Sequence, residues 1–185
     1  GGKARGLAFM DRIHAGYFDP AKYPGVTVAI PRTLVLGTDV FDDFMRENDL
    51  LPQAVGSHSD SHMANLFIKA SLPGKIVGDL RDFIRNVKVP LAVRSSSLLE
   101  DSLYQPFAGI YATKMLPNDQ VSDDIRFLNL VNAIKFVYAS TFFRQAKSYI
   151  GSTPHRVEDE KMAVVIQPVV GQAHAECFYP DFSGV

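Results

Sequence analysis

Apolar residues recur every three or four positions in several segments of the chain, which is the spacing of one face of a helix. This pattern predicts helices over residues 3–17, 38–47, 60–70, 75–87 and 122–150. In the first helix, the apolar face would carry Leu7, Met10, Ile13 and either His14 or Tyr17. In the last and longest, which Ser122 would cap, one stripe contains Val121, Ile125, Leu128, Val131, Ile134, Tyr138 and Phe142. We expect this long helix to pack on a sheet.

Short apolar, β-branched runs bounded by glycine or proline predict strands instead. They cover residues 25–31, 33–36, 91–93, 107–116, 161–170 and about 174–179. The run 161–170 has almost no polar alternation, so we expect an interior strand whose pairing weakens at Pro168.

Strands mixed with long helices indicate an α/β or α+β fold, of which we predict α+β. The 185 residues suffice for one large domain or for two lobes. Two lobes would cover 1–89 and 90–185, with Pro90 at their join.

Composition narrows the class of protein. The formal net charge is −1, which argues against nucleic acid or an acidic membrane surface as a partner. No apolar run approaches the roughly 20 residues that a membrane span needs. The single cysteine, Cys177, excludes an internal disulfide and fits a reducing compartment, so we expect a cytoplasmic protein. The opening "GGKARG" and the closing "DFSGV" suggest a fragment of a longer chain.

A lysine follows two glycines at the start of the first predicted helix. Gly1 and Gly2 place free backbone N–H groups beside Lys3, and such a helix N-terminus can bind an anion, typically phosphate. Gly-Gly-Lys is a common sequence, however, and a solvated surface lysine is the alternative.

Arg94 leaves the predicted strand 91–93 and enters a run of three serines, 95–97. Its planar guanidinium, with hydroxyl and amide donors around it, suits a polyphosphate. The alternative is an ion pair with Glu100 or Asp101 that holds the loop.

The histidines and acids give little support for a metal site. His58 and His62 have the spacing of two ligands on one helix face, but no third ligand follows. An N-cap at Ser59 or Asp60 explains that segment instead. Acidic runs occupy residues 42–43, 123–124 and 158–160. All fit helix or loop surface and none ends an apolar strand, so we predict no metal ligand within this chain.

Several of these segments, taken in order, resemble the N-terminal nucleotide-binding region of the phosphoenolpyruvate synthase and pyruvate phosphate dikinase family. "GGKARGLAFM" is similar to the family's GGK-x-x-x-L-x-x-M. "VPLAVRSSSLLEDSLYQPFAGIYAT" is similar to its V-R-S-S-A-x-x-E-D-x-x-x-x-S-F-A-G-Q-x-x-T, and "MAVVIQPVV" to its M-A-V-x-V-Q-x-M-V strand. "ASTFFRQAKSY" resembles the segment after the family's long helix, so the resemblance spans nearly the whole chain.

The resemblance implies an ATP-grasp-like fold, in which two α+β lobes close on a nucleotide, here truncated at the C-terminus. Carried over position by position, Lys3 and Arg94 would contact the phosphates of ATP, and Arg94 would also steady the transferring phosphoryl group. Gly109 would let the backbone approach the triphosphate closely. Thr113 is a further candidate from the same loop and strand.

The resemblance also implies where the remaining parts of the reaction lie. Gln167, Pro168 and Val169 would form the strand edge against adenine, with a backbone carbonyl and N–H on the base and Val169 packed on its face. Ligands of the Mg²⁺ that accompanies ATP would lie beyond Val185, as would a phosphohistidine domain and a pyruvate domain. ATP would give its β-phosphoryl group to that histidine, which would pass it to pyruvate. The parent would thus be a phosphotransferase, and this piece alone would be inactive.

The chain departs from the family pattern at a few positions. Ile110 stands where the family has glutamine, Gln145 where it has arginine, and 97–99 where it has smaller residues. These departures leave two alternatives open. One is a related dikinase with a different acceptor, and the other is a catalytically silent module that binds nucleotide or a partner and regulates a larger protein.

Overall fold

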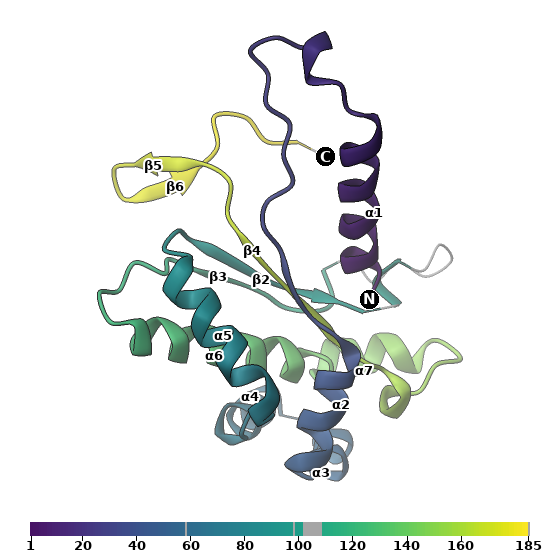
Figure 1. Ribbon diagram of the computed structural model, residues 1–185. Helices are drawn as coiled ribbons and strands as arrows, with labels where there is room; N and C mark the ends of the chain where they lie inside the picture. Colours follow the sequence, from purple (N-terminus) through teal and green to yellow (C-terminus); the bar gives the residue numbers. More distant parts are fainter. Residues whose placement is uncertain (58, 98, 102–108, 185) are drawn as a thin grey trace.

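The computed structural model describes residues 1–57, 59–97, 99–101 and 109–184 (Figure 1). They form a four-stranded sheet in the order β1-β4-β2-β3, in which every neighbouring pair is antiparallel. Its strands are β1 (Leu34–Leu36), β2 (Leu91–Ser96), β3 (Thr113–Leu116) and β4 (Ala163–Pro168). A separate hairpin joins β5 (Gln172–His174) and β6 (Cys177–Tyr179). Helices with an antiparallel sheet confirm the predicted α+β class.

Helices account for most of the remaining chain. They are α1 (Gly2–Tyr17), α2 (Thr38–Glu47), α3 (Leu51–Gly56), α4 (Asp60–Lys69), α5 (Gly74–Asn86), α6 (Asp123–Ser140) and α7 (Arg144–Gly151). Three short 3₁₀ turns are η1 (Pro20–Lys22), η2 (Leu99–Asp101) and η3 (Val157–Asp159). No helix of the described residues is both long enough and apolar enough to cross a membrane.

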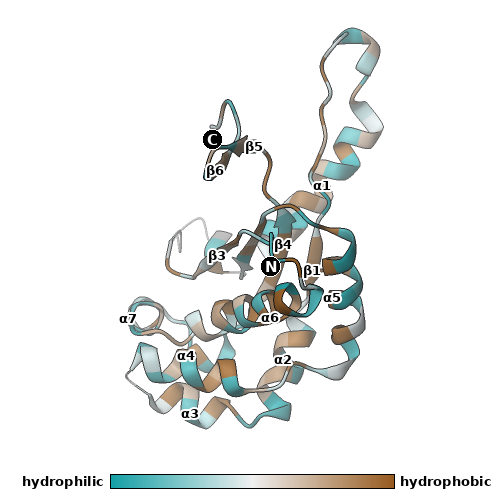
Figure 2. Ribbon diagram, turned by 90° about the vertical axis from the view of Figure 1, so that its left-hand side faces the viewer, coloured by the Kyte–Doolittle hydropathy of each residue, from teal (hydrophilic) through white to brown (hydrophobic). Residues whose placement is uncertain are grey.

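The core lies between one face of the sheet and α6, which runs across beneath β2 and β3 (Figure 1). Helices α4 and α5 pack on α6 in turn. Tyr138 of α6 is fully buried at the centre, with the rings of Phe41 and Phe44 5.1 and 5.4 Å away. Strand β4 lies inside the sheet between β1 and β2, as predicted, and Figure 2 shows how apolar β1 and β4 are.

The long helix predicted over 122–150 is two helices, because α6 ends at Ser140 and α7 begins at Arg144. Ser122 caps α6 as predicted, since its hydroxyl accepts from the N–H of Ile125 at 3.4 Å. The predicted apolar stripe is buried only in its second half. Val121, Ile125 and Leu128 are exposed, by 102%, 51% and 56%. In this first part of α6, the inward face carries the buried Arg126, whose guanidinium donates to the carbonyl of Val87 at 3.0 Å. A pattern of apolar residues cannot predict a buried arginine.

Three strand predictions need correction. Residues 25–31 are irregular, and no strand of the described residues pairs with them, so their β-branched composition alone does not make a strand. The strand predicted over 107–116 begins only at Thr113, with residues 107 and 108 outside the described residues. The strand predicted over 174–179 is part of the β5–β6 hairpin, which turns at Ala175 with φ +51°. Helix α3, which contains Pro52 in its first turn, was not predicted.

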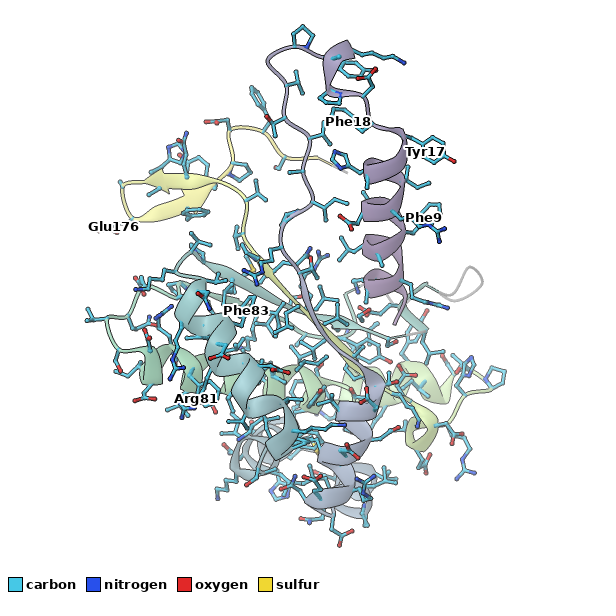
Figure 3. All side chains as sticks on the ribbon, viewed as in Figure 1. Phe9, Tyr17, Phe18, Arg81, Phe83 and Glu176 are labelled. Atoms are coloured by element: carbon cyan, nitrogen blue, oxygen red, sulfur yellow. The ribbon has the colours of Figure 1, made fainter. Side chains whose placement is uncertain are left out.

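Helix α1 stands out from the sheet and buries none of its residues (Figures 1 and 3). Its predicted apolar face is exposed, with Met10 at 58% and Tyr17 at 83%. Figure 3 shows Phe9 and Tyr17 pointing away from the rest of the protein. Packing along its length therefore does not hold α1 in place, and its contacts with the sheet are concentrated at its N-terminus.

Candidate functional site

The N-terminal turn of α1 is fastened to the end of β2 by backbone contacts. The N–H of Ala4 donates to the hydroxyl of Ser96 at 3.2 Å, and the N–H of Gly2 donates to the carbonyl of Ser97 at 3.3 Å. Gly1 lies so close that a Cβ there would be 1.5 Å from the carbonyl oxygen of Ser96. The two segments that the sequence singled out, "GGK" and "RSSS", are therefore in direct contact.

Lys3 adds a charged contact to this junction. Its ammonium forms an ion pair with the carboxylate of Glu100, whose side chain is only 5% exposed, whereas the Lys3 side chain keeps 30% of its exposure. The same oxygen of Glu100 accepts from the hydroxyl of Ser95 at 2.9 Å. Lys3 is thus held in place rather than freely solvated. An ammonium has three N–H donors, so the ion pair leaves others for an anion.

Glu100 also closes a capping box with Ser97. Its second oxygen accepts from the N–H of Ser97 at 3.0 Å, while the hydroxyl of Ser97 accepts from the N–H groups of Leu99 and Glu100 at 3.0 and 3.3 Å. Serine followed three positions later by glutamate is the sequence signature of this cap. The signature was readable in the sequence, where Glu100 was considered only as a partner of Arg94. The structure pairs it with Lys3 instead.

Arg94 lies within β2 and not at its end, because the strand continues to Ser96. It pairs with Val165 of β4 on one side and with Thr113 of β3 on the other. Its side chain is exposed, on the face opposite buried Val93. Among the described side chains, which do not include that of Asp101, Arg94 has no ion pair.

The start of α1 lies on the side of the sheet from which Arg94 projects. Arg94 and Ser96 are two positions apart on a strand, so their side chains leave the sheet on one face. Because Ser96 accepts from Ala4, the N-terminus of α1 stands on the face from which Arg94 projects. That Lys3 and Arg94 line one cleft stays a prediction.

Of two further predicted residues, Thr113 lies beside Arg94 and Gly109 precedes Thr113 in the chain. Thr113 is the cross-strand partner of Arg94 and is exposed on the same face. Gly109 occupies the turn that leads into β3, with φ +76°, a left-handed conformation that glycine adopts without strain. The N–H of Ala112 donates to the hydroxyl of Ser140 at 3.0 Å, which fixes this turn to α6.

The residues predicted to contact adenine lie at the end of β4, and two of their donors are already used. Gln167 is 8% exposed, and its amide donates to the hydroxyl of Thr33 at 2.9 Å. The N–H of Val169 donates to the carbonyl of Pro90 at 2.8 Å. Since Pro168 has no N–H, the predicted reading of the base by a backbone N–H at 168–169 does not fit this arrangement. Beyond the Leu34–Ile166 pair, β4 has no partner in β1.

A groove of about 290 Å³ runs between α1 and the segment before β1. Its lining consists of apolar residues and three polar ones, namely Ala4, Leu7, Ala8, Asp11, Ile30, Pro31, Arg32, Thr33 and Val35. Thr33 connects the groove to Gln167 through the hydrogen bond above. Apolar side chains with a small number of polar groups among them are typical of small-molecule sites.

Glu160 is a second buried carboxylate near the end of β2, which the sequence placed on the surface. It is 8% exposed, and burial raises its pKa, although hydrogen bonds with Ser97 and Tyr111 oppose that rise. Burial also raises the pKa of Tyr111, to which the charge of Glu160 contributes. The periodicity of a polar loop gives no sign that one of its acids turns inward.

No group of three or more histidine, cysteine, aspartate or glutamate side chains in the described part of the chain is placed to hold a metal ion. His58, one of the two histidines with metal-ligand spacing, lies outside the described residues. The alternative prediction for this segment is confirmed, because the hydroxyl of Ser59 accepts from the N–H of His62 at 3.3 Å and caps α4.

A helix N-terminus that carries a lysine, fastened beside a strand with an exposed arginine, is typical of a domain that binds an anionic ligand. A family model, "Pyruvate phosphate dikinase, AMP/ATP-binding domain", matches residues 1–185. The chain therefore belongs to this family, as its motifs indicated, and an adenine nucleotide is the ligand that the family binds. No curated protein matches the chain.

Proposed function

We propose that this chain is the nucleotide-binding part of a phosphotransferase of phosphoenolpyruvate synthase type. The complete protein would pass a phosphoryl group from ATP to a histidine on a separate domain, and from there to pyruvate. The observation that carries the proposal is the junction of α1 with β2. There the contact of Ala4 with Ser96 brings the start of α1, the helix that carries Lys3, to the side of the sheet on which Arg94 lies.

In this proposal the chain acts by holding and neutralising the phosphates. Lys3 offers the N–H donors that Glu100 does not use, and Arg94 offers a planar guanidinium without an ion pair among the described side chains. Thr113 and the backbone at Gly109 would add neutral donors. Charge that builds on the phosphoryl oxygens during transfer is stabilised by such fixed cations, which is how the chain would lower the barrier.

Adenine would lie against the end of β4. Val169 would pack on the base, and a backbone carbonyl of 167–168 would accept from it on the side that β1 leaves unpaired. The N–H of Val169 is excluded from this role while it is bonded to Pro90. The groove beside α1, which reaches Gln167 through Thr33, offers room for the rest of the nucleoside.

The ATP-grasp-like architecture with two closing lobes is part of the proposal, as is a cytoplasmic location. A division at 89/90 stays a prediction, and β1 pairs with β4 across it. Mg²⁺ commonly bridges the phosphates of ATP in phosphoryl transfer. Ligands for it beyond Val185 are part of the proposal, and we assign it no step here.

An assay of AMP release from ATP tests the proposal in the complete protein. We expect AMP to appear when pyruvate is present and Arg94→Ala to lose most of that rate. AMP release with a different acceptor would identify a related dikinase. Nucleotide binding without AMP release under any of these conditions would contradict phosphoryl transfer and favour the silent regulatory module. The 185 residues alone should bind MgATP weakly and show no turnover.

A further inference from the structure

The two carboxylate oxygens of Glu100 serve different parts of the structure. Oε2 accepts from the N–H of Ser97 at 3.0 Å and closes the cap of η2, which is a local role. Oε1 accepts from the hydroxyl of Ser95 at 2.9 Å and also contacts the ammonium of Lys3, which belongs to α1. A cap needs only the first oxygen, so the contact with Lys3 requires a separate explanation.

We propose that Glu100 is a positioning residue of the nucleotide site, which holds the ammonium of Lys3 where the phosphates of an adenine nucleotide bind. The inference rests on the proposed phosphate role of Lys3 and Arg94. A lysine side chain loses considerable rotamer freedom when it is ordered by a ligand. Because Glu100 already restricts Lys3, a phosphate that binds there orders the side chain at a smaller entropic cost.

The opposite effect would be sequestration, in which the carboxylate competes with phosphate for Lys3. The exposure of the two side chains favours positioning. The side chain of Glu100 is 5% exposed, whereas that of Lys3 is 30% exposed. The ammonium can therefore keep Glu100 as one partner and still present N–H donors to a ligand. The hydroxyl of Ser95 and the N–H of Ser97 also share the negative charge of Glu100.

Glu100→Gln separates the two roles, because glutamine also closes a capping box but lacks the charge that holds Lys3. In the full-length protein we expect E100Q to bind MgATP and inorganic tripolyphosphate roughly tenfold more weakly. Adenosine, which has no phosphate, should bind E100Q and the unmodified protein equally well. Damage to the fold would weaken adenosine too. Lys3→Ala should also weaken tripolyphosphate, and adding E100Q to it should cause no further loss.

Asp123→Asn is the matched control, because it removes the carboxylate partner of Arg126 on α6. Its affinities for all three ligands should equal those of the unmodified protein. If E100Q fails to fold, Ser95→Ala removes one contact to the same oxygen and keeps the charge. It should weaken tripolyphosphate by a smaller factor and leave adenosine unchanged, and unchanged tripolyphosphate affinity would count against the inference.

The outcomes distinguish this inference from the proposed function. Equal or tighter binding of tripolyphosphate by E100Q, together with weak binding by Lys3→Ala, would overturn the role of Glu100 and leave the phosphate site intact. If the unmodified protein binds neither MgATP nor tripolyphosphate, the proposed function fails and the role of Glu100 fails with it. The proposed function and the role of Glu100 also fail if Lys3→Ala and Arg94→Ala each bind MgATP and tripolyphosphate with the affinity of the unmodified protein.

Discussion

Replacing Arg94 by alanine should abolish most nucleotide binding while leaving the fold intact. The side chain is exposed in the middle of β2, and no ion pair or hydrogen bond of its guanidinium occurs among the described side chains. Its removal therefore leaves no buried group unsatisfied. Substitutions of this kind usually change the free energy of unfolding by less than about 0.5 kcal/mol.

The effect on binding should be much larger. A hydrogen bond to a charged group contributes about 1.5–3 kcal/mol, so losing even one such contact to phosphate weakens MgATP by about 10- to 150-fold. Arg94→Lys keeps the charge but not the planar pair of donors, so it should lose about tenfold or less. Calorimetric titration of the full-length protein with MgATP measures both variants, and AMP release measures the consequence for turnover.

The control for this experiment is Arg156→Ala. Arg156 is also an exposed arginine, 3.7 Å from Glu158 in the loop after α7, and its loss should change neither affinity nor turnover. Undiminished binding and turnover in Arg94→Ala would remove Arg94 from the site. An equal loss in Arg156→Ala would show that overall charge, and not the position of Arg94, determines affinity.

Three further substitutions test the structure around the site by urea unfolding. Burial raises the pKa of Glu160 above its ordinary value of 4.5, so the folded protein holds this proton more tightly than the unfolded chain does. The free energy of unfolding should therefore fall as the pH rises from 4.5 through the raised pKa. Glu160→Gln should abolish that fall and should be more stable than the unmodified protein at neutral pH. An unchanged dependence of stability on pH in this variant would contradict the reasoning. Tyr138→Phe should keep or raise stability by up to about 1 kcal/mol, because the buried hydroxyl has no partner among the described residues, and a clear loss would reveal one. Asn118→Ala should cost about 1–3 kcal/mol, because its left-handed backbone suits asparagine and its side chain donates to two carbonyls, one of them buried. The carbonyls of Val87 and Val89 accept from the Asn118 amide at 2.9 and 3.0 Å. A change in the free energy of unfolding close to zero would show that these hydrogen bonds contribute little.

Patterns that depend on near neighbours in the chain predicted the fold well. The helices α2, α4 and α5 and the interior strand β4 lie where periodicity and composition placed them, within a few residues. The failures have a common cause, which is that a strand or a helix face also depends on its partner. Residues 25–31 have strand-like composition, but no strand in the described part of the chain pairs with them. In the first turns of α6, Arg126 points inward because it donates to the carbonyl of Val87, which lies far away in the sequence.

In the candidate site, too, the sequence predicted the local features but not the contacts between distant residues. Motif order identified the family and drew attention to Lys3 and Arg94, and the structure shows that the segments carrying them touch. The contact between Lys3 and Glu100 could not be predicted, because nothing in local spacing shows which acid a distant lysine will meet. The use of the N–H of Val169 by Pro90 is likewise a tertiary contact. It changes which backbone groups are left for the base.

The most direct test of the account is a structure of the full-length protein with a non-hydrolysable MgATP analogue. We expect phosphate oxygens within hydrogen-bonding distance of both the Lys3 ammonium and the Arg94 guanidinium, about 2.7–3.2 Å, with Lys3 still in contact with Glu100. The base should lie against the end of β4. Phosphates bound away from both cations, or bound to Arg94 while Lys3 faces solvent, would contradict the claim that α1 and β2 together form the phosphate site.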